Sequence, residues 1–150
     1  KPTNGQILEI GFIRTDDNLN VRHMRSFCFK PPPNLAPGIH EMHLKNGLLV
    51  DGHESTWTLD TAERVLIDLV GPDKPVLHGS GLHFDRLWLE TYMPDLYSKL
   101  SHVSFDVQTL RQFWGRGRPT KIHRALACLL GNIAELKAFR QMGVGIPCQK

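Results

Sequence analysis

Two short segments of the sequence hold side chains that can bind a metal ion or move a proton. Residues 77–85 end in Asp85, directly after an expected strand-to-helix turn, where a carboxylate can project toward a ligand. Residues 121–128 hold His123, an acid-base group near neutral pH, and Cys128. Each also has a structural interpretation: a carboxylate stabilised by a helix dipole, a surface histidine and a small buried hydrophobic side chain.

Two other patterns do not reach the spacing that their chemistry needs. His40 and His43 are one residue too close for the His-Glu-x-x-His zinc motif, so we expect no zinc site there. Gly79 and Gly81 follow an expected strand, but no third glycine stands at the place that the dinucleotide-binding fingerprint requires. The sequence therefore does not favour a Rossmann domain.

The first half of the chain predicts a hairpin followed by a helix. Residues 6–15 and 21–30 have the composition of strands, and Asp16, Asp17 and Asn18 supply the turn between them. Three consecutive prolines at 31–33 must leave the sheet, because proline donates no ladder hydrogen bond. We expect a short helix within 37–47 and then a loop as far as Trp57.

The second half predicts strands alternating with helices. Thr58 is the expected N-cap of a helix over 59–70, followed by a strand at 75–78, a helix at 84–92, a strand at 103–107 and a helix at 109–114. The last helix is expected over 123–142. This order indicates an α/β fold with a mixed sheet flanked by helices, an RNase H-like arrangement. The apolar side of the last helix is expected to hold Leu126, Leu129, Leu130, Ile133, Leu136 and Phe139.

Composition predicts one ordinary domain. The chain has 150 residues, of which 41% are hydrophobic and 22% charged, close to globular averages. It holds no apolar run of the roughly 20 residues that a membrane span needs and no signal-peptide pattern, so we expect a cytoplasmic protein. Cys28, Cys128 and Cys148 are widely spaced and odd in number, which indicates reduced thiols.

Positive charge is concentrated in the last quarter of the chain. Residues 1–110 carry a net charge of −4, whereas residues 111–150 carry +7. Arg116 and Arg118 stand in a Gly-Arg-Gly-Arg-Pro loop, with Lys121 just beyond it. Such a stretch can attract phosphates and hold a nucleic-acid backbone without reading bases. The alternative is an ordinary solvated surface.

Several segments, taken in order, resemble the DEDDh 3′→5′ exonucleases and most closely the oligoribonucleases. Gln-Ile-Leu-Glu-Ile-Gly at 6–11, Gly-Ser-Gly-Leu-His-Phe-Asp at 79–85 and His-Arg-Ala-Leu at 123–126 are similar to family motifs. Further matches at 43–48, 92–94 and 105–107 extend the similarity over roughly residues 6–140. The resemblance implies an RNase H-like fold and release of nucleoside monophosphates from the 3′ ends of short single-stranded RNA or DNA.

The resemblance also assigns roles to residues. In the family, four carboxylates hold two divalent metal ions, Mg²⁺ or Mn²⁺, and a histidine acts as the general base. Asp85 would be a metal ligand and His123 the base, while Cys128 occupies the position of the last acid. Homodimers are usual among oligoribonucleases, and no membrane partner is implied. The expected substrate-binding residues are His43, Ser80, Gly81, Arg116, Arg118, Lys121 and Arg124.

The sequence departs from the family at the acids. The Asp-x-Glu motif of the family would lie on a strand upstream of Lys1, and a thiol at Cys128 is a poor ligand for hard Mg²⁺. We therefore expect weak or absent cleavage by residues 1–150 and a sequence truncated before that strand. Without it, the hairpin and the 75–78 strand would have unpaired edges. The alternative function is a degenerate exonuclease fold that binds nucleic acid or a protein partner without cleaving.

Overall fold

Four strands and seven helices make up the part of the chain that the computed structural model describes, residues 6–116 and 123–146. β1 (Glu9–Thr15) and β2 (Val21–Cys28) form an antiparallel hairpin, and β3 (Leu77–Gly79) and β4 (Ser104–Asp106) form a parallel pair. The helices are α1 (Pro37–Lys45), α2 (Leu48–Glu54), α3 (Leu59–Val70), α4 (Leu82–Tyr92), α5 (Pro94–Lys99), α6 (Val107–Phe113) and α7 (Ala125–Gln141).

The hairpin turn is held by the side chain of Asp16. Its carboxylate Oδ1 accepts hydrogen bonds from the backbone N–H groups of Asn18 and Asn20, both at 2.9 Å. Leu19 adopts a positive φ of 60° in this turn, yet its side chain is buried. A short acidic side chain that bonds to the backbone two residues on is a common way to fix a tight turn.

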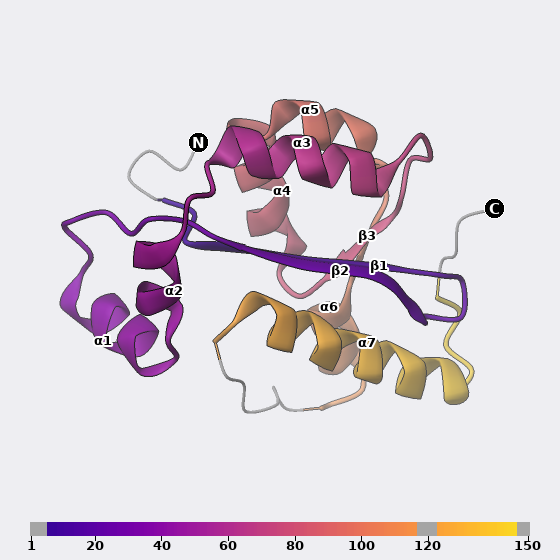
Figure 1. The fold of residues 1–150 in the computed structure, drawn as a ribbon. Helices are drawn as coiled ribbons and strands as arrows, with labels where there is room; N and C mark the ends of the chain where they lie inside the picture. The colour runs from indigo at the N-terminus through magenta and orange to yellow at the C-terminus, as the bar shows by residue number, and fades with distance from the viewer. Residues whose placement is uncertain (1–5, 117–122, 147–150) are drawn as a thin grey trace.

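Helices cover both faces of the hairpin (Figure 1): α3 and α5 lie on one side, and α7 lies on the other. On the α3 side, Phe27 and Phe29 of the hairpin segment pack with Leu66 and Met93 in one buried cluster. On the α7 side, Val107 and Leu136 belong to a second cluster. The strands are thus the middle layer of a helix–sheet–helix sandwich.

The RNase H-like α/β fold expected from the sequence is confirmed, and so are the hairpin and the helix that begins after Thr58. The Thr58 hydroxyl accepts a hydrogen bond from the Thr61 N–H, and the Thr61 side chain accepts one from the Thr58 N–H, which makes a reciprocal cap. Burial of the α3 apolar face then stabilises the helix.

The structure differs from the expectations in four details. The expected loop before Trp57 contains α2, which begins after Gly47 at a φ of 78°. A further helix, α5, begins at Pro94, a residue suited to the first helical position. Leu130, expected on the apolar side of α7, is 44% exposed, because it lies about a quarter turn around the helix from Leu129. In addition, the strands form two separate two-stranded sheets rather than one.

Other expectations concern thiols and membranes. Cys28 and Cys128 are free thiols, as expected, and Cys148 lies outside the described residues. Among the described helices, none combines the length and the apolar character that crossing a bilayer would require.

Candidate functional site

The turn that leads from β3 to Asp85 is fastened to the end of β4. Gly81 has a φ of 75°, which favours glycine, and its N–H donates to the Asp106 carboxylate at 3.1 Å. The N–H of Leu82 donates to the same carboxylate at 3.1 Å. Asp106 also caps α6 by accepting from the N–H of Gln108 at 2.8 Å. One carboxylate therefore sets the direction in which α4 begins.

A buried arginine, Arg111, also supports the turn that leads from β3 to α4. Arg111 is 3% exposed, and its Nε donates to Glu135 at 2.7 Å. Its other nitrogens donate to the Ser80 hydroxyl and to Asn132 Oδ1, each at 2.9 Å. The hydrogen bond to Glu135 is the main cause that raises the Arg111 pKa above its ordinary value. This network ties α6, α7 and the β3–α4 turn together.

The Asp85 carboxyl lies in the first turn of α4 in an environment that disfavours its charge. Desolvation raises the pKa of this carboxyl above its ordinary value, a hydrogen bond to its own backbone opposes that shift, and the negative charge of Asp106 adds to it. The residue is nonetheless exposed at the surface, so the shift in pKa is moderated by solvent and the carboxylate remains accessible to a cation.

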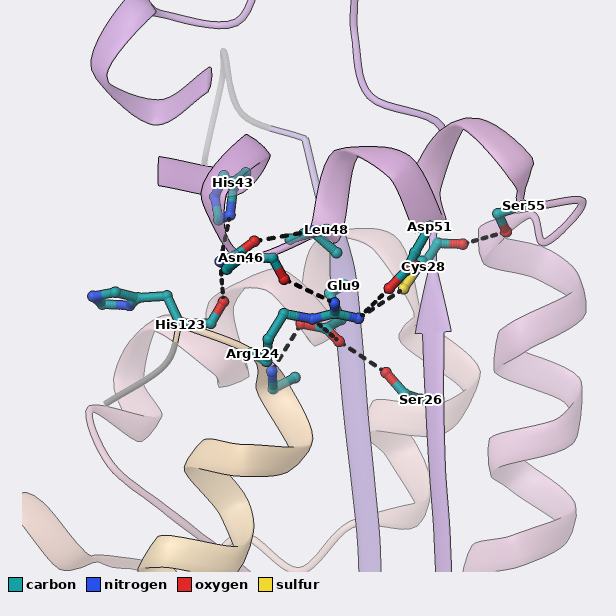
Figure 2. Close-up of polar contacts among 11 residues, drawn as sticks. Glu9, Ser26, Cys28, His43, Asn46, Leu48, Asp51, Ser55, His123 and Arg124 are labelled. Carbon is teal, nitrogen blue, oxygen red and sulfur yellow. Dashed lines mark hydrogen bonds and ion pairs between the residues drawn. The ribbon is translucent and has the colours of Figure 1, made fainter. Parts of the chain in front are cut away.

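A second polar network joins the start of α7 to the hairpin and to α2 (Figure 2). Arg124 donates from Nε to Glu9 at 3.1 Å and from Nη2 to Asp51 at 2.7 Å. Its Nη1 donates to the backbone oxygen of Asn46 at 3.2 Å, and the N–H of Ala125 donates to Glu9 at 2.8 Å. Glu9 is largely buried, with 7% of its side chain exposed, so these donors replace the water that would otherwise bind its oxygens.

His123 and His43 border this second network. The side chain of Asn46 donates to the backbone oxygen of His123 at 2.6 Å, and His43 lies 3.5 Å from the same amide nitrogen. Figure 2 shows the exposed His123 ring pointing away from Arg124. Burial lowers the pKa of His43 below its ordinary value, and the nearby His123 lowers it further. The backbone that carries His123 is therefore held in place, while its ring stays accessible.

The expected site residues fall into two groups and one outlier. The first group adjoins the Asp106 and Arg111 networks. Gly81 and Ser80 hydrogen bond to them, and Asp85 and Cys128 interact with them electrostatically. His43, His123 and Arg124 form the other group.

Arg116 is the outlier. Its guanidinium lies 5.3 Å from the ring centroid of Phe139, near the far end of α7 from His123. That helix of 17 residues is about 25 Å long. Arg118 and Lys121 lie outside the described residues. The substrate roles of all these residues remain predictions.

The described residues do not by themselves fit a two-metal site. Within residues 6–116 and 123–146, no three His, Cys, Asp or Glu side chains come together as a metal-binding group. Among the residues to which the resemblance assigned metal binding, Asp85 is the one with hard oxygen ligands. The nearby Asp106 oxygens already accept hydrogen bonds from three backbone N–H groups. We therefore derive no reaction step through a metal.

Glu9, Asp106 and Arg111 were not among the site residues expected from the sequence. Two of them carried a readable signal: Asp106 directly precedes a helix, as N-cap residues do, and Glu9 is a charged residue within an apolar strand. Arg111 had no such signal, because its buried position depends on contacts with α7.

Comparison with known proteins gives a consistent set of relatives. No family model matches the chain. The oligoribonuclease of Chromobacterium violaceum is 28% identical over 157 residues, covering 93% of this chain and 87% of that protein. The mitochondrial oligoribonucleases of Bos taurus and Homo sapiens are each 30% identical over 153 residues, covering 90% of this chain. The chain spans 65% of the length of these two mammalian relatives.

Proposed function

We propose that this chain is an oligoribonuclease-like member of the DEDDh exonucleases and that it acts as a 3′→5′ exonuclease on short RNA. The observation that carries the proposal is similarity to proteins named oligoribonuclease over about nine-tenths of the chain. That span includes both the segment that ends in Asp85 and the one that begins at His123. The two-metal mechanism is a general feature of the family and enters here through that membership.

Each of the two groups of site residues has a task in this proposal. Asp106 and Arg111 position the turn that presents Asp85, the expected metal ligand. Asn46 and Arg124 hold the chain on either side of the accessible ring of His123, the expected general base. Arg124 is then a positioning residue, since Glu9 and Asp51 already bind its guanidinium. The metal identity, Mg²⁺ or Mn²⁺, and the roles of His43 and Ser80 in substrate binding are part of the proposal.

A second candidate function is binding without cleavage. Two observations favour it: in the described ranges the acidic residues do not gather into a metal-binding group, and a thiol stands at Cys128. Such a protein would retain single-stranded nucleic acid or a protein partner on the same surface. Cytoplasmic location and a homodimer remain proposals under either function.

The test is a gel assay on short RNA and DNA labelled at the 5′ end, with Mg²⁺ or Mn²⁺ and with EDTA. If Asp85 is the metal ligand and His123 the general base, cleavage should disappear in the Asp85→Asn and His123→Ala variants. Glu90→Gln, on the exposed part of the same helix as Asp85, and His102→Ala are matched controls that should keep native activity. Tight binding of the oligonucleotide with no metal-dependent shortening would favour the second function, and cleavage that survives both substitutions would contradict the assignment.

A further inference from the structure

Aromatic and apolar side chains come to the surface where α6 and α7 end. Phe113 is 79% exposed, and Trp114 and Met142 are also exposed. Single exposed apolar side chains are ordinary, whereas a contiguous group of them indicates a surface of interaction. We call Phe113, Trp114, Arg116 and Met142 the aromatic–arginine patch.

The rings of this region form a series that leads from the core to the surface. The ring centroid of buried Phe139 lies 5.7 Å from that of Trp114, which in turn lies 4.6 Å from that of Phe113. The Arg116 guanidinium lies 5.3 Å from the Phe139 centroid, and its Nη2 lies 3.5 Å from Sδ of Met142. The patch is thus packed against the core at Phe139 and open to solvent at Phe113.

The backbone holds the patch in a defined position. Gly115, which follows the end of α6, has a φ of 60°, in the left-handed region that favours glycine. Its N–H donates to the oxygen of Gln112 at 3.1 Å. The N–H of Arg116 donates to the oxygen of Arg111 at 2.8 Å, which completes a Schellman motif. Because the Arg111 side chain also supports the turn before Asp85, one residue positions both the patch and that turn.

The patch carries a positive charge. Among the described residues, no carboxylate forms an ion pair with Arg116. Exposed rings beside a guanidinium suit single-stranded nucleic acid, because bases stack on rings and phosphates accept hydrogen bonds from arginine. A purely apolar partner would cover the rings but leave the guanidinium without an anion.

We propose that the aromatic–arginine patch is a second contact for single-stranded RNA, separate from Asp85 and His123. One base stacks on Phe113, and a phosphate binds Arg116. The inference rests on the proposed function for its substrate class, RNA, but it concerns binding and does not require cleavage.

The position of the patch sets the length of RNA that can reach it. Phe113 ends α6, seven residues after the N-cap Asp106, which corresponds to about 10 Å along the helix. Asp106 is close enough to Asp85 for its charge to act on that carboxyl. A stacked strand rises about 3.4 Å per nucleotide, so RNA with its 3′ end at Asp85 needs about three nucleotides to reach Phe113. Longer RNA therefore gains a contact that a dinucleotide lacks.

The experiment compares the affinities of a dinucleotide and of an RNA of about ten nucleotides, well beyond that reach. Both are labelled at the 5′ end, and binding is followed by fluorescence anisotropy in EDTA, so that no metal-dependent cleavage interferes. The native protein should bind the longer RNA more tightly. Phe113→Leu keeps an apolar side chain but removes the ring, so it should weaken binding of the longer RNA about tenfold and leave the dinucleotide unaffected. Phe113→Trp restores a ring and should keep native affinity.

Trp57→Leu is the matched control. It also removes an exposed ring, but one just before α3, on the opposite side of the strand layer from α7 (Figure 1). It should keep native affinity for both RNAs, and circular dichroism checks that each variant is folded.

Four outcomes would overturn the inference. Unchanged binding of the longer RNA by Phe113→Leu overturns it alone, and the proposed function stands if the native protein cleaves short RNA when metal is added. An equal loss for both RNAs would assign the ring to the site at Asp85. A loss of self-association in Phe113→Leu, measured by sedimentation, with RNA affinity unchanged, would assign the patch to a second copy of the chain. No binding of either RNA by the native protein would contradict the inference and the proposed function together.

Discussion

The Glu9 carboxylate accepts a hydrogen bond from Nε of Arg124 at 3.1 Å, so an ion pair joins the start of β1 to the residue that precedes α7. The two residues are 115 positions apart in sequence. Because Glu9 is 7% exposed and Arg124 is 24% exposed, little water competes for their charges. The side chain of Asn46 donates a hydrogen bond to the backbone oxygen of His123, and the backbone oxygen of Asn46 accepts one from Arg124. The Glu9–Arg124 ion pair therefore also helps to position the expected base.

Removing Arg124 should therefore destabilise the fold. Arg124→Ala leaves the buried Glu9 carboxylate with fewer donors, and we expect a loss of about 2–4 kcal/mol in the free energy of unfolding. Urea denaturation monitored by circular dichroism measures this quantity. Lys45→Ala, which removes an exposed pair with Glu41, is the control and should change stability by less than about 0.5 kcal/mol. Equal effects of the two substitutions would contradict a structural role for the Glu9–Arg124 pair.

Asp106 should control both the β3–α4 turn and the charge of Asp85. Asp106→Ala removes the acceptor for three backbone N–H groups and should cost about 1–3 kcal/mol. Asp106→Asn keeps an acceptor but removes the negative charge, so the Asp85 pKa should move down toward its ordinary value. NMR titration of the Asp85 carboxyl carbon checks the second effect. An unchanged Asp85 titration would show that Asp106 does not act on this group.

These networks mark the boundary of what the sequence could predict. The hairpin, the Thr58 cap and the order of strands and helices follow from local periodicity and turn chemistry. Asp85, His43 and His123 could be singled out because short motifs surround them. The partners of Arg111 and Arg124 could not be predicted, since they come from segments up to 115 positions away and depend on tertiary packing. The division of the strands into two sheets could not be predicted either, because it depends on which strands pair in the folded chain and not on the sequence of any one strand.

The raised pKa of Asp85 predicts a pH dependence with a definite sign. The folded state holds a proton on this carboxyl at pH values where the unfolded chain has released it, so this group's stability contribution falls as pH rises through the folded pKa. Asp85→Asn should raise the melting temperature at pH 7, and the difference should shrink as pH falls through the raised folded pKa toward 3.8, the ordinary value. Thermal melts from pH 3 to 7 test this. A lower melting temperature for the variant at pH 7 would mean that the charged carboxylate is stabilising.

The basic loop after α6 should govern how salt affects binding to single-stranded oligonucleotides. Each phosphate contact releases counterions, so the logarithm of the binding constant falls linearly with the logarithm of salt concentration. Arg116→Ala combined with Arg118→Ala should reduce that slope by about one to two, as expected for one contact per arginine. Fluorescence anisotropy between 50 and 200 mM salt, a range of about fourfold, measures it. Lys99→Ala, on α5, serves as the control for lost charge alone. An unchanged slope would remove the loop from the binding surface.

Cys128→Asp addresses the chemistry that the family's last acid supplies. An aspartate brings a hard oxygen ligand and a negative charge to a position on α7 that is close enough to interact with Arg111. In a protein that also carries the expected Asp-x-Glu strand, metal-dependent 3′→5′ cleavage should rise at least about tenfold, while oligonucleotide affinity changes little.

The matched variant is Cys128→Asn, which has nearly the same shape as the aspartate but no charge and should not increase cleavage. Both proteins are compared with the native one on the same short RNA and DNA, with Mg²⁺, Mn²⁺ or EDTA. Strong cleavage by the native protein would show that the thiol does not disable the site, because the remaining ligands would then suffice. No cleavage by any of the three, despite tight binding, would favour the binding function, since restoring the acid would have had no chemistry to complete.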